Sequence, residues 1–141
     1  MKHYQIMPRN WFLVEGKPRP VVAIGRNRVY VQHSSERPHA NKISSGDLIP
    51  LPINEELIAH SNLRCQHHEE DNVYDSLRLK HETVDLPFTL RFCFDKEEPC
   101  EIIFPTGYTI WMKHIHRLQQ FVHALTGEEL RIKMKFTDPY D

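Results

Sequence analysis

The alternation of apolar and polar side chains over residues 88–94 constrains this chain more than any other feature of its sequence. In "FTLRFCF", the large apolar residues recur at every second position and share one face of a β-strand: Phe88, Leu90, Phe92 and Phe94. The opposite face carries Thr89, Arg91, Cys93 and Asp95. "DKEEP" then predicts a turn and "CEIIF" a returning strand. The sequence therefore predicts an antiparallel hairpin whose aromatic face needs a cover.

The stretch that follows this hairpin supplies a cover, because its period changes from two to that of a helix. Apolar residues at i, i+3, i+7 and i+10 form one stripe, with Phe121 alongside: Ile115, Leu118, Val122 and Leu125. Gly127 is the residue type that ends a helix in a left-handed conformation. We therefore expect one main helix over about residues 112–126, packed on the phenylalanine face.

The period changes back to two after this helix. In "ELRIKMKF", the apolar residues alternate with basic ones, so a C-terminal strand is predicted over residues 130–136. Its outward side chains would be Arg131, Lys133 and Lys135. They would give the last strand a basic face.

The N-terminal third is rich in β-forming residues. Residues 11–16 predict a short strand, residues 17–20 ("KPRP") a turn, and residues 21–32 a hairpin that reverses at "GRN". The polar residues 33–47 predict a loop.

The middle of the chain predicts one short helix between polar segments. Residues 53–62 predict this helix, with Asn54 as its N-cap, after an extended "LIPLP". Residues 65–75 ("CQHHEEDNVYD") predict an acidic loop.

These elements define the predicted fold class. It is α+β, with an N-terminal β-hairpin or small barrel-like region and an antiparallel sheet that carries the main C-terminal helix. A length of 141 residues is near the commonest domain size, so a single domain over 1–141 is expected. Within it we expect a β-rich lobe over residues 1–50, with the remaining elements over 51–141.

Composition bears on the compartment. Hydrophobic residues make up 40% of the chain, and no apolar run approaches the ~20 residues of a membrane span. The first residues, "MKHYQIMPRN", lack the apolar core of a signal peptide. Three irregularly spaced cysteines do not make a disulfide framework and suit a reducing compartment. A cytoplasmic protein without a membrane partner is expected.

Histidines near the start of the helix raise the question of a metal. Helical residues two apart point about 200° apart, so His114 and His116 would not chelate one ion unless they lay on a strand. His116 and His123 would share a face but sit about 10.5 Å apart along the axis. We therefore expect these histidines to be polar positions on the exposed side of the helix.

A second group of potential ligands lies in one short segment: Cys65, His67, His68, Glu69, Glu70 and Asp71. Its spacing matches no structural zinc pattern. The chain also lacks a nucleophile elbow, a phosphate-binding glycine loop and an H-E-x-x-H motif. The expectation is a protein without catalytic residues, metal or cofactor. A metal-dependent enzyme using His67, His68, His114 or His116 is kept as an alternative.

Charge is distributed unevenly along the chain. Residues 1–47 hold eight basic and three acidic residues (+5), residues 48–105 five and twelve (−7), and residues 106–141 five and four (+1). The leading expectation is non-catalytic binding of a macromolecular partner, first of all a protein, through basic surfaces. Its candidate residues are Arg9, Lys17, Arg19, Arg26, Arg28, Arg131, Lys133 and Lys135. The alternative is nucleic-acid binding by the basic N-terminal lobe, against which the sequence pI of about 6.8 counts.

The C-terminal block adds a resemblance. "IHRLQQFVHALTGEEL" (115–130) resembles the closing block V-H-x-L-Q-N-L-Y-x-A-L-T-G-x-E-L of short uncharacterised proteins from Bacteroides-type bacteria, their phages and mobile elements. "LIPLPINEELI" (48–58) is similar to the extended I-P-L-T-E-E-L-L segment of those proteins. The chain departs from the block at Gln120, where the family has Asn, and at Val122 and His123, where it has an aromatic pair.

The resemblance implies a setting and no catalytic residue. It implies a small accessory protein of a phage or mobile element, which would act on a host protein, for example as an inhibitor of a defence system.

Overall fold

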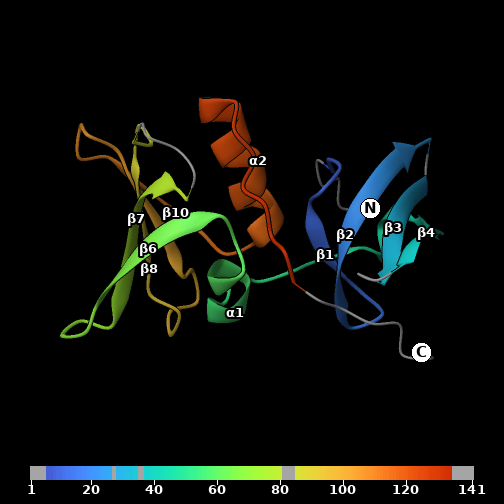
Figure 1. The fold of residues 1–141 in the computed structure, drawn as a ribbon, viewed down its shortest axis with the longest axis horizontal. Coiled ribbons are helices and arrows are strands. Elements are labelled where there is room, and N and C mark those ends of the chain that lie inside the picture. The colour runs from blue at the N-terminus through green and yellow to red at the C-terminus, as the bar shows by residue number, and fades with distance from the viewer. Residues whose placement is uncertain (1–5, 27, 35–36, 81–84, 135–141) are drawn as a thin grey trace. The chain divides into compact units, whose positions relative to one another are not determined.

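The computed structural model describes residues 6–26, 28–34, 37–80 and 85–134, and these form two compact units (Figure 1). The second unit is Pro52–Lys133, and the first contains the chain up to Leu51. Each unit holds one five-stranded antiparallel sheet. The expected α+β class is confirmed, with most of the regular structure in strands. That the whole chain is one domain stays a prediction.

The first sheet has the strand order β4-β3-β2-β1-β5. Its strands are β1 (Trp11–Val14), β2 (Lys17–Gly25), β3 (Arg28–Ser34), β4 (Arg37–Ser44) and β5 (Ile49–Pro50). Its core consists of buried apolar residues from these strands and their connections: Phe12, Val14, Val21, Val29, Val31 and Leu48. The predicted first strand and the hairpin over residues 21–32 are confirmed as β1 and β2–β3.

The turn predicted over residues 17–20 ("KPRP") is wrong. The chain reverses two residues earlier, at Glu15 and Gly16, whose φ angles of 52° and 77° are both positive. Positive φ at both central residues suits a tight two-residue hairpin turn, so β2 already begins at Lys17. Pro18 and Pro20 lie in the part of β2 that pairs with β1 and before its pairing with β3, so they interrupt only one ladder.

The loop predicted over residues 33–47 is also wrong in its described part. β4 occupies Arg37–Ser44 and pairs with β3, and a short 3₁₀ helix, η1 (Ser45–Asp47), follows. β4 lies at the edge of the sheet, where polar side chains do not need a buried face. The polar sequence of residues 37–44 therefore gave no indication of this strand.

The second sheet has the strand order β10-β9-β8-β7-β6. Its strands are β6 (Leu63–His68), β7 (Val73–Leu79), β8 (Thr89–Phe92), β9 (Cys100–Ile103) and β10 (Thr109–Met112). The hairpin predicted from residues 88–104 is confirmed as β8–β9. Leu90 and Phe92 are fully buried, as the alternation requires.

Helix α2 (Ile115–Thr126) covers the buried face of this sheet, as predicted. The Phe121 ring lies 5.4 Å from that of Phe88 and 6.1 Å from that of Phe104, measured between centroids. Ile115, Leu118 and Val122 are fully buried. Gly127 ends the helix with φ 74°.

Two details of this helix were wrong. It begins at Ile115 instead of about residue 112, because Met112 is the last residue of strand β10 (Thr109–Met112). The buried stripe also excludes Leu125, which is 49% exposed, and includes His116, which is almost fully buried instead of lying on the exposed side.

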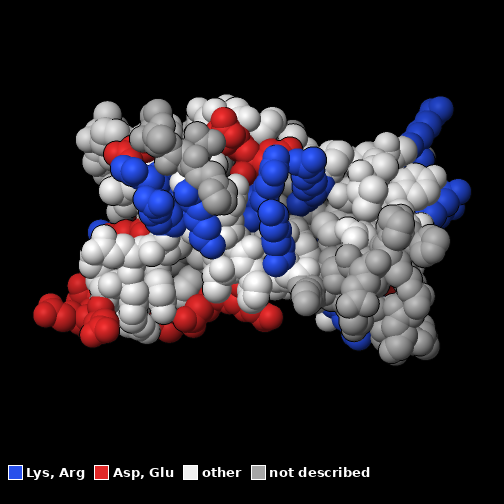
Figure 2. All heavy atoms as spheres, viewed as in Figure 1, with Lys and Arg blue, Asp and Glu red and all other residues white. Residues whose placement is uncertain are grey.

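The acidic loop predicted over residues 65–75 is wrong as well. β6 and β7 form a hairpin there, and its turn contains Asn72 with φ 51°. Figure 2 shows Asp and Glu side chains at the end of the second sheet where Figure 1 places this turn. The exposed acidic residues Glu69, Glu70 and Asp71 lie in it.

The short helix and its Asn54 cap are confirmed, but α1 (Glu55–Ala59) is shorter than the predicted range of 53–62. The Asn54 side-chain oxygen accepts a hydrogen bond from the Leu57 backbone N–H at 2.9 Å. This cap satisfies one of the backbone donors that a helix start leaves without a partner.

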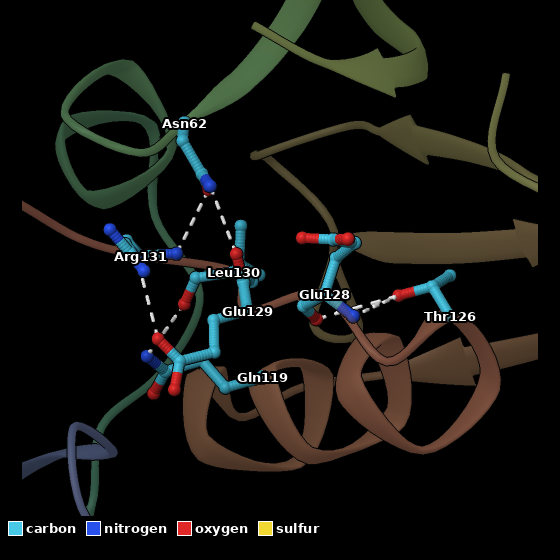
Figure 3. A network of polar contacts seen from close by, with 7 residues as sticks. All are labelled: Asn62, Gln119, Thr126, Glu128, Glu129, Leu130 and Arg131. Carbon is cyan, nitrogen blue, oxygen red and sulfur yellow. Dashed lines mark hydrogen bonds and ion pairs between the residues drawn. The ribbon is translucent and has the colours of Figure 1, made fainter. Parts of the chain in front are cut away.

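The predicted C-terminal strand is absent from its described part, which ends at Met134. Only an isolated bridge joins Ile132 to Ser61, and polar side chains hold the segment instead (Figure 3). Asn62 donates to the Glu129 carbonyl at 2.9 Å and accepts from the Arg131 N–H at 2.9 Å. Gln119, buried in α2, donates to the Leu130 carbonyl at 3.1 Å. No helix in the described ranges is both long enough and apolar enough to span a membrane.

Candidate binding face

One row of side chains crosses the second sheet on the face away from α2. Register pairs link neighbouring strands directly, so the side chains of each pair point the same way. From β6 to β10 the row is Gln66, Asp75, Arg91, Glu101 and Trp111. We call the surface that carries this row the outer face. The neighbouring inward residues, such as Leu90 and Ile102, are buried.

The centre of the outer face is a partly exposed ion pair. The Asp75 carboxylate accepts two hydrogen bonds from the Arg91 guanidinium, at 2.9 and 3.2 Å. His68 Nε2 lies 3.2 Å from the same carboxylate. The hydrogen bond to Asp75 raises the pKa of Arg91 above its ordinary value, and nearby Glu101 acts in the same direction. The guanidinium is therefore fixed in a forked geometry on the open face.

An apolar row runs beside the charged one. Thr89, Ile103 and Thr109 are register partners across β8, β9 and β10, and Leu77 on β7 is 51% exposed. Leu77, Thr89 and Arg91 line a shallow depression of about 680 Å³ that reaches Arg64 and Gln66 on β6. Arg is enriched at the centre of protein interfaces, so the fixed Arg91 beside an exposed apolar side chain suits a binding surface.

Trp111 closes the row at the edge strand β10. Its side chain is 39% exposed, and the Lys96 ammonium lies 5.0 Å from the ring centroid. That distance is within the range of a cation–π interaction. Tyr108 and Ile110, 77% and 40% exposed, lie beside it. Large apolar side chains are therefore concentrated at this edge of the sheet.

The basic residues singled out from the sequence are divided between the two units. Arg9, Lys17, Arg26 and Arg28 are exposed in the first unit, whereas Arg19 is only 7% exposed. The Arg19 guanidinium donates to the Gln32 carbonyl at 3.4 Å, so this side chain has a structural partner.

Arg131 and Lys133 belong to the second unit, and Lys135 lies outside the described residues. Arg131 and Lys133 line a groove of about 450 Å³ with Lys80 and Glu128, and Arg131 pairs with Glu129 at 3.2 Å. Figure 2 shows several Lys and Arg side chains gathered on the face that carries this C-terminal segment. The groove is mixed in charge, because the Glu128 and Glu129 carboxylates line it beside the basic side chains.

The histidine and cysteine cluster is divided between the two faces of the sheet. On β6, His67 stacks on Tyr74 with ring centroids 4.3 Å apart, whereas His68 approaches Asp75 on the outer face. Successive strand residues point to opposite faces, so these side chains do not converge. Within the described ranges, no group of three or more His, Cys, Asp or Glu side chains is placed to hold a metal ion.

The thiols are poor nucleophiles in this environment. All three cysteines are free. Burial raises the pKa of Cys65 to about 11 and raises that of Cys100 still further. A hydrogen bond to Asp95 raises the pKa of Cys93. Each thiol is therefore held in its protonated form at neutral pH.

Comparison with known proteins adds nothing to these observations. No family model matches the sequence, and no curated protein or solved structure matches the chain. The assignment of the outer face as a candidate binding face therefore rests on its geometry.

Sequence reasoning missed Leu77 and Trp111 as surface residues. The alternation had placed Thr89 and Arg91 on the face away from the phenylalanines, and extending that register across the sheet could have found their neighbours. The sequence predicted a helix from about residue 112 and no strand at Thr109–Met112, so the strand that carries Trp111 was not expected.

Proposed function

We propose that this chain is a non-catalytic binding protein of the cytoplasm that holds a partner protein on the outer face of its second sheet. The observation that carries the proposal is the exposed Leu77 beside the fixed Asp75–Arg91 pair, with Trp111 on the same face. Aromatic residues and Arg dominate the energetics of protein interfaces.

The chemistry of the rest of the chain supports a binding role. Raised thiol pKa values remove the cysteines as ready nucleophiles, and His67 and His68 point to opposite faces. The resemblance of residues 115–130 adds the proposed setting of a phage or mobile element. The partner would then be a host protein, and inhibition of a defence system is one form this accessory role would take.

A photo-crosslinking experiment tests the proposal. A photoreactive amino acid at Leu77 should capture one protein from a Bacteroides-type host lysate, identified by mass spectrometry. The matched control is Val22, which is 48% exposed in the first unit against 51% for Leu77. Equal capture from both positions, or none from Leu77, would contradict the proposal.

A second variant separates contact from folding. Leu77→Asp should lower capture of the purified partner at least about tenfold, since a charge would be desolvated at the centre of the interface. Its unfolding transition should stay near that of the wild type, because exposed substitutions usually change stability by only about 0.5 kcal/mol.

A second candidate function is nucleic-acid binding by the first unit. Arg26 and Arg28 are both exposed at the β2–β3 turn, and Lys42 on β4 pairs with Tyr30 on β3. A basic surface with an adjacent aromatic residue suits a nucleic-acid backbone. This candidate predicts retention on DNA at low salt, lost in an Arg26→Glu/Arg28→Glu variant and falling steeply with added salt.

A further inference from the structure

Three of the four edge strands of the two sheets carry features that oppose pairing with another chain. β4 contains Pro38 and Lys42, and β5 has two residues and contains Pro50. β6 carries exposed Arg64 and Gln66. Short edges, prolines and charges are the usual protections against added strands.

The fourth edge strand, β10, has the opposite character. Thr109–Met112 contains no charge and no proline. Tyr108, Ile110 and Trp111 are 77%, 40% and 39% exposed. In the second unit, the described exposed large apolar residues away from this strand are Leu77 and Leu125. The apolar surface of the unit is therefore concentrated on the edge that lacks protection.

The hydrogen-bond pattern shows which groups of β10 point outward. The Phe104 N–H donates to the Tyr108 carbonyl at 2.9 Å, so Tyr108 and, by alternation, Ile110 and Met112 direct their backbone groups toward β9. Thr109 and Trp111 then direct theirs to the edge of the sheet that pairs with no described strand. Lys113 follows the same alternation, and its carbonyl accepts from the Ile53 N–H at 2.8 Å.

We propose that β10 pairs with β10 of a second copy of this chain, in an antiparallel dimer centred on Ile110. This inference shares Trp111 with the outer face, but it does not require the partner protein proposed above. Only one register pairs both outward residues of one strand with those of the other. In it, Thr109 of each copy lies opposite Trp111 of the other copy. It forms four backbone hydrogen bonds about a two-fold axis.

The side chains fit this register. Ile110 faces its own copy directly on one face of the joined sheet, and the two Trp111 rings are diagonal neighbours on the other, within reach of aromatic side chains. Met112 faces Tyr108. No residue from Tyr108 to Met112 is charged, so the paired strands themselves oppose no like charges, although each copy carries a Lys96 ammonium 5.0 Å from its Trp111 ring centroid. An interface of this length is small, so the dimer is expected to dissociate on dilution.

A concentration series on the full chain, followed by light scattering or sedimentation, tests the pairing. The wild type should shift from one to two chains per particle as concentration rises. Thr109→Pro removes an outward donor and no bond to β9, and should weaken the dimer at least about tenfold, because the two-fold axis doubles the loss. Leu77→Lys, an exposed apolar residue away from the edge, should leave the dimer unchanged.

A cross-link fixes the register. In a Cys93→Ser background, Ile110→Cys should form an intermolecular disulfide on mild oxidation, since directly opposed residues of this kind lie about 4.5 Å apart between Cα atoms. Leu77→Cys should not. A chain that stays monomeric at every concentration overturns the proposal. So does a dimer that survives Thr109→Pro without the Ile110 cross-link, because it would use another surface.

Discussion

The two faces of the second sheet are built from the same strands and have opposite consequences. The inner face carries fully buried side chains such as Leu90 and Phe92 under helix α2. The outer face carries an ion pair, Asp75–Arg91, and the half-exposed Leu77. Alternation along each strand assigns stability to one face and leaves the other available for a partner. Substitutions on the two faces should therefore separate folding from binding.

The largest effect is expected on the inner face. Phe92→Ala should lower the free energy of unfolding by about 3–5 kcal/mol, because it leaves a cavity in a fully buried site. Leu77→Ala removes an apolar side chain from the outer face. It should change the free energy of unfolding by less than about 0.5 kcal/mol. Denaturant titrations measure both. Similar losses in the two variants would remove the distinction between the faces.

The next effect concerns pH. Burial lowers the pKa of His116 from 6.5 to about 4, and neighbouring His114 and Arg117 add to this. The His116 imidazole therefore binds a proton more tightly in the unfolded chain than in the folded chain. The contribution to stability is full above about pH 6.5 and is lost as the pH falls toward 4, by up to about 3 kcal/mol.

Unfolding of His116→Leu across this pH range checks the assignment. Between pH 6.5 and 4, the free energy of unfolding should fall less in the variant than in the wild type, because the variant lacks the His116 imidazole. His123→Gln, at an exposed position of the same helix, is the control. A His116→Leu variant with the wild-type slope between pH 6.5 and 4 would contradict it.

A smaller effect is expected for the polar clamp on the C-terminal segment. Asn62→Ala removes the bonds to the Glu129 carbonyl and the Arg131 N–H and should cost about 1–2 kcal/mol. Asn62→Asp keeps an acceptor and loses the donor, so an intermediate loss is expected. Hydrogen exchange at residues 129–133 should accelerate in the same order. Unchanged exchange in Asn62→Ala would show that the segment does not depend on this side chain and is held by its backbone bonds and by Gln119.

The smallest effect on stability is expected at the outer ion pair. Arg91→Lys should lower the free energy of unfolding by less than about 1 kcal/mol, because the pair is partly exposed, with 44% of the Arg91 side chain accessible. Capture of the partner protein should nevertheless fall about tenfold, since Lys does not reproduce the forked geometry. A stability loss well above this value, with binding intact, would assign the pair to the fold.

Part of this architecture could be predicted because its signals are local. The alternation that strand β8 (Thr89–Phe92) confirms, the Asn54 cap and the Gly127 helix end each depend on neighbours within a few residues. The polar strands β4 and β6 gave no such signal. An edge strand obtains its hydrogen bonds from one neighbour and needs no apolar pattern of its own.

The candidate face could not be predicted in the same way. Arg91 was placed on the correct face, but Asp75, its ion-pair partner, is sixteen residues away along the chain. Basic residues close in sequence were favoured instead, and one of them, Arg19, is buried.

By itself, the sequence determined the alternation of the β8–β9 hairpin, the helix that covers it and the class of the fold. These follow from periodicities that hydrophobic burial imposes on a short stretch of chain. Only the tertiary structure decided which polar segments become strands, that His116 faces inward, and which charges meet on the outer face. Those outcomes depend on strand register across the sheet, and register is a relation between distant segments that no local pattern records.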